Sequence, residues 1–85
     1  MAIISHERFN NEDIYLDYDF EEVMFRYDHK TKNIYRKFYG EQEHPEAIHY
    51  SNRLYCDTRL FGDEITKEQY LEGREKGDRP FKPSR

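Results

Sequence analysis

The amino-acid sequence predicts an α+β domain, in which a small antiparallel three- to four-stranded β-meander is followed by two C-terminal α-helices that cover its apolar face. Two alternating apolar and polar runs flank a polar turn between residues 23 and 39, which is typical of a β-hairpin. Helix-start signals follow in the C-terminal half. The chain has 85 residues, so these elements form one domain with a modest core.

The composition predicts a folded chain despite a high charge content. Charged residues make up 38% and hydrophobic residues 35%, yet eight Tyr and six Phe supply large rings for a core. The single cysteine excludes an intrachain disulfide, and no apolar run is long enough for a signal sequence or a membrane span. We therefore expect a soluble, cytoplasmic protein that does not bind membranes.

Two strands are expected before the hairpin. Residues 3–9 read as the first strand and Asn10-Asn11 as the turn that follows it. Residues 14–20 alternate apolar and polar side chains, which predicts a second strand with one apolar and one acidic face. The apolar phase shifts at Glu21-Glu22, so these residues should hold a bulge or a tight connection.

The hairpin is the firmest structural prediction. If Asp28 and Asn33 close its turn, Val23 faces Phe38, Phe25 faces Arg36 and Tyr27 faces Ile34 on the side toward the core. The opposite face is then basic and aromatic. It carries Met24 opposite Lys37, Arg26 opposite Tyr35, and Glu22 opposite Tyr39.

The C-terminal half is expected to be mainly helical. Residues 47–50 read either as a short strand or as the lead into a helix at residues 52–61, with Ser51 as N-cap and Gly62 beyond the end.

A capping box starts the last helix, which we expect at residues 67–75. Its signals are Thr66 and, three residues later, Gln69. We place the domain at residues 1–76 and expect residues 77–85 to form a disordered basic tail.

The residues that could carry chemistry do not form a known signature. His44, His49 and Cys56 match no common zinc spacing, and Cys56 reads as a buried or half-buried structural thiol. The carboxylates near residue 20 lack the central glycine and final glutamate of a calcium loop, so they read as a solvated strand face. The sequence therefore predicts no metal, no cofactor and no enzyme activity.

Charge is segregated along the chain and defines two candidate binding surfaces. Residues 1–24 hold seven carboxylates and one arginine, whereas residues 25–38 hold five basic residues and one aspartate. An acidic surface for a basic groove of a partner protein would comprise Asp17, Asp19, Glu21 and Glu22. A hairpin surface for a protein or for single-stranded nucleic acid would comprise Arg26, Tyr35, Lys37 and Tyr39. The acidic strand and the hairpin could instead neutralise each other.

One resemblance bears on function. The motif K-x-x-Y-R-K-F-Y-G at residues 32–40 and the G-D-E-I-T-K-E-Q-Y step at residues 62–70 resemble small accessory proteins of tailed bacteriophages and other mobile elements. The resemblance implies a host-directed inhibitor or regulator that acts by binding, with no catalytic residues. Our leading hypothesis is thus a non-enzymatic module that binds a bacterial host protein, one that handles nucleic acid. Direct binding of single-stranded nucleic acid is the alternative, and an exposed first strand leaves a homodimer open.

Overall fold

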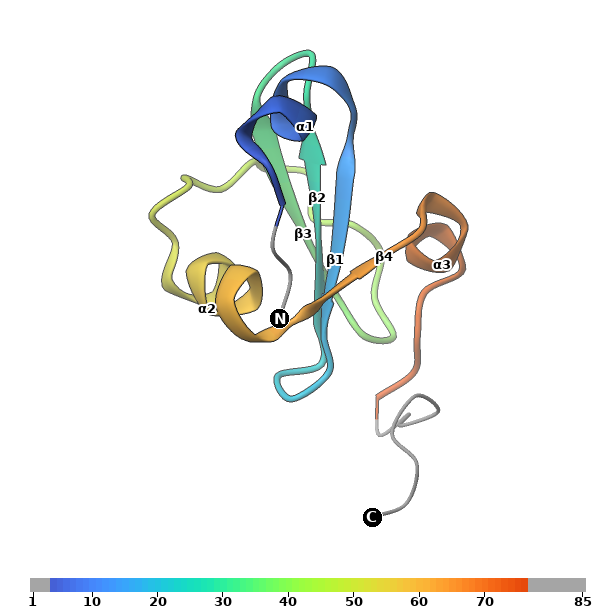
Figure 1. The fold of residues 1–85 in the computed structure, drawn as a ribbon. Coiled ribbons are helices and arrows are strands. Elements are labelled where there is room, and N and C mark those ends of the chain that lie inside the picture. The colour runs from blue at the N-terminus through green and yellow to red at the C-terminus, as the bar shows by residue number, and fades with distance from the viewer. Residues whose placement is uncertain (1–3, 77–85) are drawn as a thin grey trace.

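Four strands form one antiparallel sheet with helices on both of its faces (Figure 1). The computed structural model describes residues 4–76, so the expected tail at residues 77–85 lies outside the described residues. The strand order is β3-β2-β1-β4, which confirms the α+β class. The elements are α1 (His6–Asn11), β1 (Ile14–Tyr18), β2 (Val23–Asp28), β3 (Asn33–Phe38), α2 (Arg53–Phe61), β4 (Asp63–Ile65) and α3 (Lys67–Glu72).

The predicted hairpin is β2 and β3, in the expected register. Val23 pairs with Phe38, Phe25 with Arg36, Tyr27 with Ile34, and Asp28 with Asn33 at the turn. The Asp28 side chain accepts a hydrogen bond from the Lys30 backbone at 2.9 Å, and the Asp28 carbonyl accepts one from Lys32 at 2.7 Å. Lys32 takes a positive φ of 65°, which closes the turn.

The expected first strand is instead the helix α1. The Ser5 side chain caps it by accepting a hydrogen bond from the Arg8 backbone at 3.2 Å, and Asn10-Asn11 complete the helix rather than forming a turn. Arg8 ties α1 to β4 through an ion pair with Glu64. A homodimer built by pairing an exposed first strand therefore loses its basis.

The fourth strand lies where no strand was predicted. β4 joins α2 to α3 and pairs with β1, with Tyr15 opposite Ile65 and Asp17 opposite Asp63. Residues 47–50 form neither of the expected elements. Only Ile48 pairs there, in an isolated bridge to Ile34, and this segment covers the outer edge of β3.

The two C-terminal helices cover opposite faces of the sheet, not the same face (Figure 1). The α2 face buries Ile14, Leu16, Val23, Phe25, Ile34 and Tyr55. The α3 face buries Tyr15, Met24, Tyr39 and Tyr70. No helix of the described region is long and apolar enough to cross a membrane.

The helix ends differ in detail from their predictions. The N-cap of α2 is Asn52 rather than Ser51, and its side chain accepts a hydrogen bond from the Tyr55 backbone at 3.1 Å. The capping box of Thr66 and Gln69 is confirmed. α3 ends three residues earlier than expected because Gly73 takes a φ of 77°, which terminates the helix.

Candidate protein-binding site

Asp17 is buried, so the expectation that it lies on a solvated acidic face is wrong. Its side chain is on the α3 face and only 2% exposed. Tyr39 donates a hydrogen bond to its Oδ1 at 2.6 Å, and Arg74 donates one to its Oδ2 at 2.7 Å. Burial raises the pKa of the Asp17 carboxyl, while the hydrogen bonds from Tyr39 and Arg74 oppose that rise. Asp17 and Tyr39 therefore stabilise the fold and are not presented to a partner.

Arg26 and Lys37 on the hairpin hold the α3 side of the molecule together. The Arg26 guanidinium donates two hydrogen bonds of 2.9 Å to the Glu43 carboxylate, and Tyr70 donates one to the same carboxylate at 2.6 Å. Lys37 donates to the Tyr70 carbonyl oxygen at 2.6 Å. The hydrogen bonds from Arg26 lower the pKa of Glu43. The basic hairpin thus pairs with Glu43 and α3, while the buried Asp17 pairs with Arg74.

The hairpin surface offers less to nucleic acid than its sequence suggested. Tyr39 is 1% exposed, so it cannot stack on a base. The Arg26 guanidinium lies 4.5 Å from the ring centre of Tyr35 and forms an ion pair with Glu43. This ion pair neutralises the charge that would otherwise attract a phosphate. That Tyr35, Arg26 and Lys37 contact a partner stays a prediction.

The residues of the described region that could hold a metal are Asp13, Asp28 and His29, with ligand atoms within 4.8 Å of one another. Both the backbone N–H and the ring Nδ1 of His29 contact Asp13 Oδ1, at 3.0 and 2.6 Å, and Asp28 accepts from turn amides. These hydrogen bonds attach the hairpin turn to Asp13, so the cluster has a structural role without a metal.

Cys56 is exposed, contrary to the expected burial of its thiol. It lies on the outer side of α2, and its sulfhydryl donates to the Tyr50 carbonyl oxygen at 3.4 Å. His49 contacts the Ser51 hydroxyl at 2.8 Å through Nδ1. Within residues 4–76, His44, His49 and Cys56 do not come together as a metal-binding group.

The β1–β2 turn presents an exposed aromatic ring among carboxylates. β1 ends at Tyr18, so Phe20 leaves the apolar strand face on which it was predicted and is 75% exposed. Backbone hydrogen bonds of 3.2 Å from Glu21 to Tyr18 and from Glu22 to Asp19 hold the turn. Asp19, Glu21 and Glu22 of the predicted acidic surface therefore lie in this turn, while Asp17 does not.

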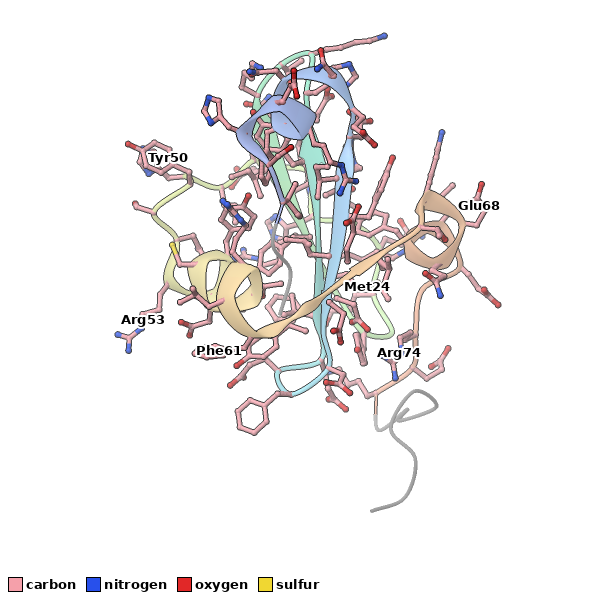
Figure 2. All side chains as sticks on the ribbon, viewed as in Figure 1. Met24, Tyr50, Arg53, Phe61, Glu68 and Arg74 are labelled. Carbon is pink, nitrogen blue, oxygen red and sulfur yellow. The ribbon has the colours of Figure 1, made fainter. Side chains whose placement is uncertain are left out.

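The C-terminal end of α2 lies at the same end of the sheet. A Cβ on the buried Gly62 would come within 2.7 Å of the Asp17 carbonyl oxygen, so α2 ends in close contact with β1. The preceding residue, Phe61, is 66% exposed, and Figure 2 shows it beside the end of the sheet. Asp57 lies four residues before Phe61 on α2, so the two side chains are on the same side of that helix. We call Phe20, Glu21, Asp57 and Phe61 the turn-end surface.

Comparison with known families identifies what kind of protein presents these surfaces. A family model described as Tis1 immunity protein matches residues 1–74, from the start of the chain through the buried Arg74. The chain belongs to the Tis1 immunity protein family. It is 51% identical to the immune protein Tis1 of Pseudomonas aeruginosa strain UCBPP-PA14 over 77 residues, which is 91% of this chain and all of that protein.

A solved structure contains a chain with the same fold. The described chain is similar, with a TM-score of 0.85 and 50% identity, to a chain in the crystal structure of the complex between the type VI effector Tas1 and its immunity protein. The match covers 89% of this chain and all of that one. Membership in the Tis1 family overturns the resemblance to phage and mobile-element accessory proteins, whose supporting motifs are a hairpin and a capping box that unrelated folds share.

Family membership agrees with the broad prediction of an inhibitory module that acts by binding another protein. It gives no support to a host nucleic-acid-handling target. Sequence reasoning missed Phe61 and Asp57 as surface residues because it treated α2 only as a cover for the sheet. It found the carboxylates of the turn through their local density.

Proposed function

We propose that this Tis1-family protein binds a type VI effector related to Tas1 and neutralises it by forming a stoichiometric complex. The observation that carries this proposal is the match, at 50% identity over 89% of this chain, to a chain in the Tas1–immunity protein complex. Identity of 50% with a TM-score of 0.85 supports a shared fold and, with it, a related mode of action.

The geometry also favours binding over chemistry. An inhibitor of this kind needs a rigid surface with large exposed side chains and complementary charge. The described region supplies exposed rings at Phe20 and Phe61, together with carboxylates in the β1–β2 turn.

Binding to purified Tas1 tests the proposal directly. We expect isothermal titration calorimetry to show a one-to-one complex, and we expect co-expression to restore growth of bacteria that produce Tas1. The immune protein Tis1 of P. aeruginosa serves as the positive control in both assays. Absence of binding by this chain, under conditions in which Tis1 binds, would contradict the proposal.

A further inference from the structure

We infer that the effector binds at the turn-end surface, with Phe20 and Phe61 entering an apolar depression whose rim is basic. The inference rests on the proposed function and deepens it by naming the contact surface. Phe20 directly follows the end of β1, and Phe61 ends α2 just before Asp63, which pairs with Asp17 near the same end of β1.

The exposure of the two rings is what first distinguishes this surface. Phe20 is 75% and Phe61 66% exposed, and the ring of Phe20 lies 6.0 Å from that of the partly buried Tyr18. Single exposed apolar residues are common on soluble proteins, whereas several large apolar side chains exposed in one region are typical of interaction sites. Buried aromatic anchors also carry a large share of the energy in protein–protein interfaces.

Both anchors are held by rigid backbone. Two turn hydrogen bonds and the positive φ of Glu22, 55°, fix the loop that carries Phe20. Phe61 ends α2, and the Gly62 backbone N–H donates to the Thr58 carbonyl oxygen at 2.8 Å immediately after it. A preorganised surface loses little conformational entropy on binding, which favours a tight complex.

Charge selects the kind of partner. The turn has the sequence Asp-Phe-Glu-Glu, in which the exposed Glu21 directly follows Phe20, and Asp57 lies on the same side of α2 as Phe61. Such an acidic rim complements a cationic rim on the effector and speeds the encounter of the two proteins. A second copy of this chain fits poorly, because a twofold contact here would place carboxylates against carboxylates.

Substitution of the two anchors tests the surface. We expect Phe20→Ala and Phe61→Ala each to weaken binding to Tas1 by at least ~30-fold, as the loss of an interface hot spot does. The matched controls are Tyr50→Ala and Leu71→Ala, which remove side chains that are 71% and 63% exposed on other parts of the molecule. The controls should bind like the unaltered protein. All four variants should unfold at the same urea concentration as the unaltered protein, because the removed groups are exposed.

Removal of the rim charges provides an independent readout. Glu21→Gln together with Asp57→Asn should slow association several-fold at low salt and flatten its salt dependence, whereas Glu46→Gln, an exposed acid in the loop before α2, should change neither. Equal affinities for the Phe20, Phe61 and Tyr50 variants would overturn the inference while leaving the proposed function intact. Absence of binding by the unaltered protein would overturn both. A dimer of the unaltered protein that Phe61→Ala dissociates would assign this surface to a second copy and overturn the inference.

Discussion

At the residue scale, the buried carboxylate of Asp17 is the contact on which the α3 face depends most. Arg74 lies 57 positions later in the chain and donates to both Asp17 and the Tyr39 hydroxyl, at 2.7 and 2.8 Å. The side chains of Asp17 and Arg74 are only 2% and 5% exposed. Removing one member of such a pair leaves the other charge buried without compensation.

We therefore expect Asp17→Asn to lower the free energy of unfolding by about 3–5 kcal/mol, measured by urea denaturation. The control is Asp63→Asn, which changes the exposed residue paired with Asp17 across β1 and β4 and should cost less than ~0.5 kcal/mol. A cost for Asp17→Asn as small as that of the control would show that the pair does not stabilise the fold.

At the element scale, the three hydrogen bonds that the Glu43 carboxylate accepts hold α3 and the loop after β3 in place. The carboxylate accepts from Arg26 and from the Tyr70 hydroxyl, so it links β2, the loop and α3. These contacts keep the pKa of Glu43 below its ordinary value near 4.5. A carboxyl whose pKa is lower in the folded state stabilises the fold above the unfolded pKa, and this contribution is lost as the pH falls through the folded pKa.

Glu43→Gln should therefore flatten the dependence of unfolding free energy on pH below about 4.5, while costing about 1–2 kcal/mol at neutral pH. Urea denaturation at a series of pH values measures both effects. Glu41→Gln, an exposed neighbour in the same loop, should leave the profile unchanged. If the Glu43 variant retains the full acid dependence, other carboxyls account for it.

At the scale of the whole molecule, the sheet carries α1 and α2 on one face and α3 on the other. The α2 face holds the larger aliphatic core, while the α3 face combines aromatic rings with buried polar contacts. The turn-end surface lies at the end of the sheet where β1 finishes. Family matching stops at residue 74, the residue that completes the buried pair.

We propose that residues 1–76 form the complete folding unit. A chain ending at residue 76 should unfold at the same urea concentration as the full chain and bind Tas1 equally well. A chain ending at residue 73 should be destabilised by several kcal/mol, because it lacks Arg74 and leaves Asp17 buried and unpaired. Weaker binding by the 76-residue chain would contradict the proposed boundary.

Sequence reasoning succeeded where neighbouring residues decide the structure. The hairpin register follows from its alternation and its Asp28–Asn33 turn, and the start of α3 follows from the Thr66–Gln69 capping box. It failed at residues 3–9, because their short apolar pattern also fits a helix that is capped by Ser5 and tied to β4 by Arg8. The three-residue β4 is too short to show a period of its own.

The sequence by itself determined an α+β chain built on one hairpin, with carboxylates gathered in the turn before it. Only the tertiary structure decided that α2 and α3 take opposite faces, that Asp17 is buried against Arg74, and that Phe20 and Phe61 are exposed at the same end of the sheet. The reason is physical: alternation, turns and caps depend on residues a few positions apart, whereas burial and surface proximity depend on contacts between distant segments.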